Sequence, residues 1–471
     1  MSWNRRYAIW SYVRSTVWIV PVIALVFEQV TLKIAYVREL DFGVIPGFSL
    51  APGATYAMMD YIVAMMISFV VFTFGSLLVA IQVASGQLSP RIIATTLLRD
   101  NVIRCTVGLF TYTLLLAMAV RIREETISST FASLAGLLAV ACVIAFLFLI
   151  DHAARLLRPV SIVWRLAEQG TKVIGQVYPH RIADLEVSRR KRKTVWRVAQ
   201  QGIKAIRQVY PGGIADVEVA PGKRKALGPA DRVIFHGGTS AIVIAVNLKM
   251  LVDAAKTADG VIELAPRVGD FVAVGEPLFL LRGGAAAIDD DLLRGQVAFG
   301  RERTIEQDPT FAFRVIVDIA IKALSKAIND PTTAVLAIDQ LHRLLRMVGS
   351  RHLHYDNIVD RDGRPRVILR TPDWEDFVQL AFSEIRLYGA ENFQIARRLR
   401  ATIENLSATL PELRLPALGR ELDVLDRTLE RLNLLPEDLA LARVPDSQGL
   451  GGSSLSGDPL AVPRIDGPTQ E

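Results

Sequence analysis

The chain has 471 residues, of which 51% are hydrophobic and 22% charged, and its formal net charge is +6. With a mean hydropathy of +0.32 it is too apolar for an ordinary soluble protein of this length, so the composition indicates a membrane protein. Its two cysteines, Cys105 and Cys142, both lie in apolar stretches, which excludes a secreted disulfide scaffold.

Four mostly apolar stretches are long enough to cross a bilayer core of about 30 Å, which needs about 20 helical residues. They cover about residues 16–37, 56–84, 103–122 and 131–150. We therefore predict an α-helical transmembrane domain over residues 1–158 with four spans. The first stretch is not a cleavable signal, because it is long and is followed by further spans.

Basic residues at the ends of these stretches predict the orientation, because Lys and Arg near short loops are retained in the cytoplasm. Three arginines precede the first stretch, and more basic residues follow the second and the fourth stretches. Four spans with both termini in the cytoplasm satisfy this rule. The large part that follows the fourth span is then cytoplasmic.

Two charged residues interrupt the first apolar stretch, Glu28 and Lys33. A charge within a span is costly, so such residues mark a substrate pathway, a buried partner or a helix contact. The alternative is that both side chains extend to a bilayer interface. The sequence alone leaves these two interpretations open.

A polar segment follows the second apolar stretch at its cytoplasmic end. Pro90 can begin a new helical segment with Ser89 as its cap, and Gly86 permits a bend. We predict a polar hinge here, with a gate, a lipid contact or a ligand rim as the functional interpretations and a plain helix end as the structural one. The hinge residues are Gln82, Ser85, Gly86, Ser89, Pro90 and Arg91.

Residues 159–230 form a basic juxtamembrane region that contains a tandem repeat, residues 163–193 and 195–225. Two copies are too few for a solenoid, so a local duplication explains the repeat. Each copy ends in a basic run that we expect to contact anionic lipid headgroups, and the alternative is a solvated hairpin. No nucleic acid is expected, because the chain has no recognisable binding motif. The two runs are Arg189, Arg190, Lys191, Arg192 and Lys193, and Lys223, Arg224 and Lys225.

Short β-type runs dominate residues 231–299, at 232–235, 241–246, 260–264 and 268–278. Gly-Asp between β-branched residues is a turn signal, and this spacing predicts a small β-barrel or β-sandwich module.

Residues 300–444 are predicted to form a helical cytoplasmic domain, and residues 445–471 a disordered tail rich in Ser, Gly, Pro and Asp. Two helices should start at Asp308-Pro309 and at Asp330-Pro331, where an aspartate cap precedes a proline at the first helical position.

Three stretches resemble a family of predicted bacterial inner-membrane proteins, domain of unknown function 2254. They are Gln82 to Arg91, Gly300 to Pro309, and Ala323 to Val335 with its Ile-Asn-Asp-Pro-Thr-Thr core. The likeness covers roughly residues 10–440, and it departs from the family at Lys326, where proline is expected, and at the extra 32-residue copy. The resemblance implies a multi-pass protein of the bacterial inner membrane and implies no known reaction.

The densest group of polar and charged side chains lies around the two predicted helix starts. Helix starts present backbone N–H groups, and neighbouring carboxylates can coordinate a metal, so the group could line a cation, phosphate or nucleotide pocket. The alternative is helix capping and ion pairing. The pocket candidates are Arg301, Glu302, Arg303, Glu306, Asp308, Asn329, Asp330 and Thr332.

The sequence contains no phosphate loop, nucleophile elbow or defensible catalytic triad, and we predict no catalytic residue, metal or cofactor. An enzyme is therefore the weaker hypothesis. The leading hypothesis is an oligomeric channel-like or transport protein with a cytoplasmic ligand- or partner-binding domain. The alternative is a non-conducting membrane scaffold or sensor in envelope maintenance.

Overall fold

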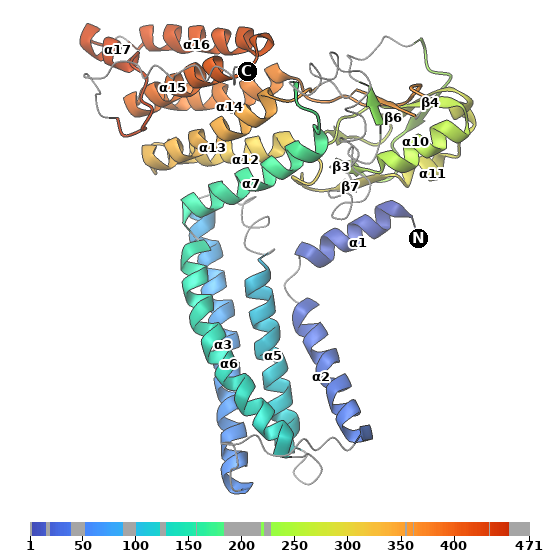
Figure 1. The fold of residues 1–471 in the computed structure, drawn as a ribbon, viewed down its shortest axis with the longest axis vertical. Helices are drawn as coiled ribbons and strands as arrows, with labels where there is room; N and C mark the ends of the chain where they lie inside the picture. Colours follow the sequence, from blue (N-terminus) through green and yellow to red (C-terminus); the bar gives the residue numbers. More distant parts are fainter. Residues whose placement is uncertain are drawn as a thin grey trace, which may run out of the picture. The chain divides into compact units, whose positions relative to one another are not determined.

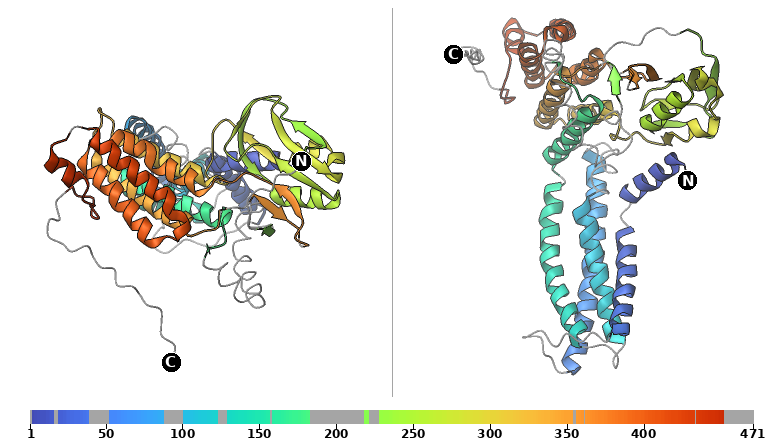
Figure 2. Two further views of the ribbon diagram at one scale, coloured as in Figure 1. Left: turned by 90° about the horizontal axis from the view of Figure 1, so that it is seen from above. Right: turned by 45° about the vertical axis from the view of Figure 1, so that its right-hand side comes forward.

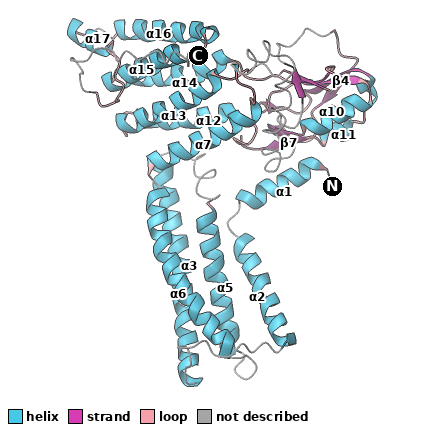
Figure 3. Ribbon diagram, in the orientation of Figure 1, coloured by secondary structure: helices cyan, strands magenta, loops and turns pink. Residues whose placement is uncertain are grey.

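The computed structural model describes residues 2–15, 19–38, 52–87, 100–122, 129–156, 158–182, 218–220, 228–353, 356–360, 362–432 and 434–451. These residues form two compact units. The first contains Met1–Val177, Lys193–Val315 and His354–Thr371, and the second contains Tyr178–Arg192, Ile316–Leu353 and Pro372–Glu471. Strands occur in the first unit, as Figure 3 shows, and the described part of the second unit is helical apart from an isolated bridge between Arg181 and Arg351.

The first unit begins with a long helical bundle. Its helices are α1 (Trp3–Ser15), α2 (Ile19–Arg38), α3 (Pro52–Gln87), α5 (Asn101–Ile122), α6 (Ser129–Leu156) and α7 (Pro159–Val177). Helices α2, α3 and α6 each pack on α5, and α3 also packs on α6 (Figure 1). The bundle follows from the apolar stretches of the sequence, because each stretch can satisfy its backbone only as a helix within a bilayer.

Among the described residues, three helices are long and apolar enough to cross a membrane, at Thr55–Val79, Asn101–Ile122 and Phe131–Ala153. They correspond to the second, third and fourth predicted spans. The first predicted span is helix α2, but its apolar part, Ile19–Thr31, is shorter than these three. Glu28 lies within that apolar part and Lys33 just after it.

The segment after this bundle is a mixed α/β module built around two sheets. Its strands are β1 (Glu218–Ala220), β2 (Arg232–Phe235), β3 (Ala241–Val246), β4 (Gly260–Leu264), β5 (Phe271–Val272), β6 (Pro277–Gly283), β7 (Val297–Gly300), β8 (Asn357–Val359) and β9 (Pro365–Ile368). The six-stranded sheet has the order β1-β8-β9-β4-β6-β2, and the three-stranded sheet has the order β5-β3-β7. All strand pairs are antiparallel except β4 with β9, in which Ile262 lies opposite Val367.

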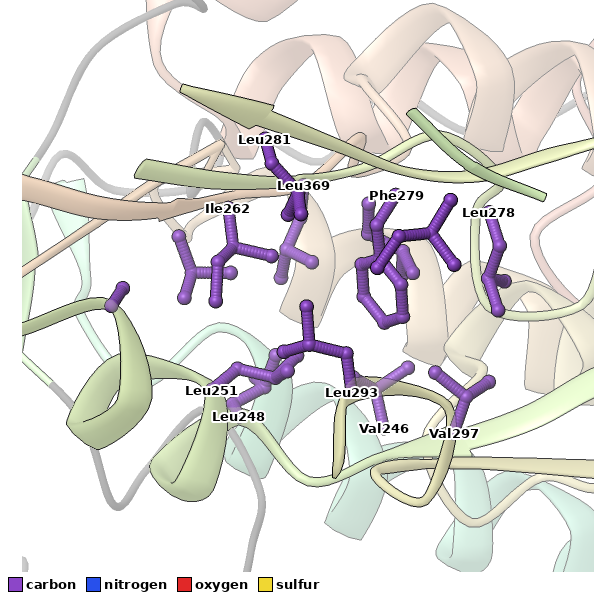
Figure 4. Packing of buried hydrophobic residues seen from close by; sticks show 14 of the residues in the cluster. Val246, Leu248, Leu251, Ile262, Leu278, Phe279, Leu281, Leu293, Val297 and Leu369 are labelled. Atoms are coloured by element: carbon purple, nitrogen blue, oxygen red, sulfur yellow. The ribbon is translucent and has the colours of Figure 1, made fainter. Parts of the chain in front are cut away.

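One hydrophobic core joins both sheets to the helix α10 (Leu248–Thr257) and the short helix α11 (Asp290–Arg294) (Figure 4). Phe279 and Leu281 of β6, Val246 of β3 and Leu251 of α10 are buried in it. The module is therefore a mixed α/β module rather than the simple β-barrel or sandwich that the strand spacing suggested. The sequence pattern missed the helices because short apolar runs do not separate strands from buried helices.

The second unit is a layer of helices that lie side by side (Figure 2). It contains the end of α12 (Pro309–Ala323), then α13 (Pro331–Gly349), α14 (Trp374–Gly389), α15 (Phe393–Thr409), α16 (Leu415–Glu430) and α17 (Pro436–Ala442). Buried arginines donate hydrogen bonds to carbonyl oxygens at its helix ends. Arg414, for example, donates to the carbonyl oxygen of Gly349 at 3.2 Å and lies 5.4 Å from the ring centre of Trp374.

The described chain continues past the predicted start of the disordered tail at residue 445. Asp446 is 6% exposed and accepts hydrogen bonds from the backbone N–H groups of Gln448, Gly449 and Gly451 at 2.7–3.0 Å. The buried side chain of Arg397 on α15 donates to the carbonyl oxygen of Gly451 at 3.1 Å. Residues 445–451 are thus bound to the helical layer, and residues 452–471 lie outside the described part.

Candidate functional site

The segment 301–308 connects β7 to α12 and carries five of the predicted pocket residues. Arg301, Glu302 and Arg303 are exposed, whereas Glu306 is half-buried and accepts a hydrogen bond from the hydroxyl group of Tyr7 on α1. The side-chain amide of Gln307 pairs with the backbone N–H of Val246 at 2.9 Å and with its carbonyl oxygen at 3.4 Å. These contacts fix the segment against β3 on one side and α1 on the other.

Asp308 caps α12, as the sequence predicted. Its Oδ1 accepts hydrogen bonds from the backbone N–H groups of Thr310 at 3.0 Å and Phe311 at 3.3 Å, and from the hydroxyl group of Thr310. Its Oδ2 is buried and has no hydrogen-bond partner within the described chain. Burial raises the pKa of this carboxyl group, against the hydrogen bonds from Thr310 and the charge of Arg303, which lower it.

Gly269 lies directly against this carboxylate. The residue has φ +95°, and a Cβ added to it would come within 2.5 Å of Asp308 Oδ2. A glycine is therefore required here both for the left-handed backbone and for the space that Asp308 occupies.

The other three pocket candidates lie in the second unit, around the start of α13. Asp330 caps that helix, with Oδ1 accepting from the backbone N–H of Thr333 at 3.0 Å and Oδ2 accepting from its hydroxyl at 2.5 Å. Asn329 is exposed with φ +46°, and Thr332 is exposed. Capping therefore occupies both carboxylate oxygens of Asp330, and one of the two in Asp308. No group of three or more metal-ligating His, Cys, Asp or Glu side chains occurs among the residues that the structure describes.

The predicted membrane residues separate in the structure. Glu28 is 2% exposed within the bundle and accepts a hydrogen bond from the Gln29 amide at 2.7 Å, whereas Lys33 is exposed. Gln82 is exposed on α3, and this helix continues without a break through Ser85 and Gly86 to Gln87. Ser89, Pro90 and Arg91 lie outside the described residues, as do both basic runs, residues 189–193 and 223–225.

A cluster that the sequence did not predict joins three helices at one end of the bundle. Asp100 precedes α5, is 8% exposed, and accepts hydrogen bonds from the backbone N–H groups of Val102 and Ile103 at 2.9 and 3.3 Å. Its two carboxylate oxygens also contact His152 Nε2 of α6 and Arg165 Nη1 of α7, each at 3.1 Å. Burial raises the pKa of Asp100, but the hydrogen bonds from His152 and Arg165 outweigh it and lower the pKa below its ordinary value of 3.8.

Only one feature of the sequence near residue 100 points to this cluster: Asp100 stands directly before an apolar helix. Such a residue can cap the helix, and its charge is favourable at the helix N-terminus. The partners could not be predicted, because His152 and Arg165 lie 52 and 65 residues away along the chain.

Helix α1 is a second unpredicted element of the site. Trp3 and Tyr7 pack on a small apolar cluster of β3 and β7 that contains Ile244, Ala245 and Ala298. The backbone N–H of Asn4 donates to the carbonyl oxygen of Gly295 at 3.2 Å. At the other end of α1, Arg104 of α5 donates to the carbonyl oxygen of Val13 at 3.0 Å. The helix thus contacts both the α/β module and the end of a membrane helix.

Long apolar helices, a mixed α/β module and a helix that contacts both define a multi-pass membrane protein with a large extramembrane part. Residues 14–405 match the family described as predicted membrane protein (DUF2254). The chain belongs to this family, as its three sequence stretches suggested.

Its relatives are mycobacterial proteins without an assigned function. Uncharacterized protein Rv1290c of Mycobacterium tuberculosis is 26% identical over 422 residues, which span 86% of this chain and 74% of the relative. Uncharacterized protein Mb1321c of Mycobacterium bovis matches with the same identity and coverage. No solved structure matches the chain.

Proposed function

We propose that this protein is a membrane scaffold or sensor that does not conduct ions and in which α1 couples the membrane helices to the α/β module. The burial of polar side chains inside the bundle carries this proposal. Glu28, Thr73 and Thr113 are at most 4% exposed, while apolar residues of α3 such as Val71 and Leu78 are 66% and 67% exposed. A conducting path needs polar groups that face water, whereas packed helices bury them.

The hydrogen bonds of the bundle support the same conclusion. Thr73 Oγ1 donates to the carbonyl oxygen of Phe69 at 2.7 Å, and Thr113 Oγ1 lies 3.3 Å from Cys142 Sγ. These groups are engaged within and between helices, as expected of residues that hold a bundle together.

A channel-like or transport protein is the second candidate, and Glu28 favours it. An ionisable residue buried in a membrane helix is a frequent mark of an ion or proton pathway. In an oligomer, Glu28 and the exposed Gln82 would then line an axis.

Ion flux distinguishes the two candidates. Purified protein in liposomes, tested with K⁺, Na⁺, H⁺ and Cl⁻ over several voltages, is expected to give no flux above empty liposomes, with an added ionophore as the positive control. Wild-type flux that Glu28→Gln abolishes and Val30→Ala leaves intact would overturn the scaffold proposal and establish the pathway. Val30 is the control because it lies on the same helix and is 47% exposed.

We further propose that α2 is a fourth span and that both termini are cytoplasmic in a bacterial inner membrane. At about 1.5 Å per residue, its 20 residues match a bilayer core of about 30 Å. The contact of α1 with the α/β module supports the crossing. If α3, α5 and α6 each cross the membrane, the module lies on the side where α3 ends. The start of α3 then lies on the opposite side, so α1 can contact the module only if α2 also crosses.

A homo-oligomer is the expected assembly, and small residues on the exposed part of α3 support it. A Cβ at Gly75 would meet no atom within 4 Å, and the neighbouring Ser76 is also exposed. Small residues let a second helix approach closely. If α3 forms the interface, Gly75→Leu should lower the oligomeric state seen by native mass spectrometry, and Phe74→Leu, at an exposed position rotated by about 100° from Gly75, should not.

We also propose that the two basic runs bind anionic headgroups, because each Lys or Arg near an anionic surface contributes about 1 kcal/mol. Replacing residues 223–225 with glutamine should reduce the protection of this segment from proteinase K, which does not require Lys or Arg, in vesicles containing phosphatidylglycerol, but not in neutral vesicles.

A further inference from the structure

Helix α1 has two apolar faces, of which only one is used by the α/β module. Trp3 and Tyr7, four residues apart, share the face that packs on the module, and their rings stack at 5.3 Å. Ile9, Tyr12 and Val13 follow at helical spacing and are 50%, 56% and 37% exposed. Because Ile9 lies two residues after Tyr7, it is rotated by about 200° from the module-facing side.

Two arginines flank the exposed apolar face. Arg5 and Arg6 precede Ile9 by four and three residues, so their side chains lie on the same side of the helix, and both residues are exposed. A face with aliphatic and aromatic side chains bordered by arginines is typical of a helix that lies in the plane of a membrane interface.

The connections of α1 place it at the bilayer boundary. Its last turn receives the hydrogen bond from Arg104 to the Val13 carbonyl oxygen, and Arg104 is the fourth residue of the Asn101–Ile122 span. Helix α2 begins at Ile19, four residues after α1 ends. The C-terminal end of α1 is therefore held level with the start of a membrane helix.

We propose that this second face of α1 is a lipid-binding surface that lies in the headgroup layer of the bilayer. Ile9, Tyr12 and Val13 contact the upper acyl chains, and Arg5 and Arg6 bind headgroup phosphates. The opposite face holds the module through Trp3, Tyr7 and the Tyr7–Glu306 hydrogen bond. Helix α1 thereby attaches the α/β module to the membrane surface, and this role does not depend on whether the protein conducts.

The test is a spin-label scan of α1 in the full-length protein, with Cys105→Ser and Cys142→Ala as the background. Single cysteines at positions 4, 9, 11, 12 and 13 carry a nitroxide, and the protein is reconstituted in phosphatidylcholine vesicles with and without phosphatidylglycerol. The measured quantity is the accessibility of each label to oxygen, which concentrates in the bilayer, relative to a nickel chelate in water. We expect this ratio to be at least threefold higher at positions 9, 12 and 13 than at positions 4 and 11, which lie on the opposite side of the helix by its 3.6-residue period.

Two results would overturn the proposal. Equal, water-like ratios along the whole helix would show that the face is solvated. Labels at 9, 12 and 13 that neither reagent reaches would show that protein, such as a second copy, covers the face.

A charge substitution gives an independent check. Ile9→Glu should move a label at position 12 toward water and lower its ratio about threefold, whereas Ile9→Ala, which adds no charge, should not. An unchanged ratio in Ile9→Glu would count against a lipid contact. Both variants must elute from size-exclusion chromatography like the unsubstituted protein, so that unfolding is not mistaken for the effect.

Discussion

Asp308 combines a necessary cap with an unfavourable charge. Its pKa is raised by burial, so the folded protein binds a proton more readily than the unfolded chain. Stability contributed by this group is then greatest at low pH and falls as the pH rises from about 3.8 through the raised pKa. An asparagine caps a helix about as well as an aspartate and has no charge to bury.

The Asp308→Asn variant is therefore expected to be at least as stable as the wild type at pH 7, and to lose part of the pH dependence of its melting temperature. Asp308→Ala should instead cost about 1 kcal/mol, because the cap is lost. Thermal unfolding in detergent between pH 4 and pH 8 measures both. A strongly destabilised Asp308→Asn at pH 7 would show that the ionised carboxylate has a partner it needs.

Gly269 offers a test of the same site through the backbone. Gly269 and Gly275 both have positive φ, +95° and +86°, but a Cβ would meet Asp308 Oδ2 only at Gly269, since nothing lies within 4 Å at Gly275. Gly275→Ala should cost about 1 kcal/mol for the left-handed conformation alone. Gly269→Ala should cost at least about 1 kcal/mol more. Equal effects in thermal unfolding would mean that Asp308 moves aside freely.

Much of the local structure could be predicted from the sequence. The predicted runs 232–235, 241–246 and 260–264 coincide with β2, β3 and β4, and helices α12 and α13 begin at the prolines that follow Asp308 and Asp330. Turn residues, caps and alternating apolar residues act over a few positions, so the sequence displays them directly.

Contacts between distant segments could not be predicted in this way. The parallel pairing of β4 with β9 brings Ile262 next to Val367 after a long excursion of the chain, and Tyr7 reaches Glu306 across 299 residues. Both depend on how whole elements pack. For the same reason the capping roles of Asp308 and Asp330 were predictable, whereas the cluster around Asp100 was not.

The composition of segment 446–451 is typical of a disordered tail, but the structure shows this segment hydrogen-bonded to α15. The backbone carbonyl of Gly451 and that of Val444 accept hydrogen bonds from Arg397, which is 1% exposed, and Arg398 donates to the carbonyl oxygen of Asp446 at 3.2 Å. Removal of an acceptor from a buried charged donor costs about 1–3 kcal/mol.

A chain that ends at Gly451 should therefore keep the wild-type melting temperature, whereas a chain that ends at Pro445 should unfold earlier by several degrees. Differential scanning fluorimetry of the two shortened proteins beside the full chain measures this difference. Identical melting curves for all three would show that the segment contributes no stability. Reduced stability in the longer of the two would mean that residues 452–471 contribute as well.

At the scale of the whole molecule, the membrane helices are the elements that the sequence predicts most clearly, apart from the question whether α2 crosses the membrane. Three spans follow from length and apolar composition alone. The proposed fourth, α2, has a weaker apolar signal because it carries Glu28 and Lys33, and hydropathy does not register that Glu28 is buried. The contact of α1 with the α/β module supports the proposed fourth crossing, since a chain that crosses three times would leave its N-terminus on the side opposite the module.

This argument predicts which sites a membrane-impermeant maleimide can reach from one side. Single cysteines are placed at Ser2, at Asp253 of the exposed face of α10, and at Ile122, which ends α5 and is 74% exposed. With four spans and both termini cytoplasmic, cysteines at 2 and 253 should be labelled in inverted vesicles and the cysteine at 122 only in right-side-out vesicles. If the cysteine at 2 is labelled from the same side as 122, α2 does not cross, and the N-terminal helix cannot contact the module in the membrane. If 2 and 253 are both labelled from outside, four spans stand and the orientation is reversed, which would mean that the basic loops do not set the topology.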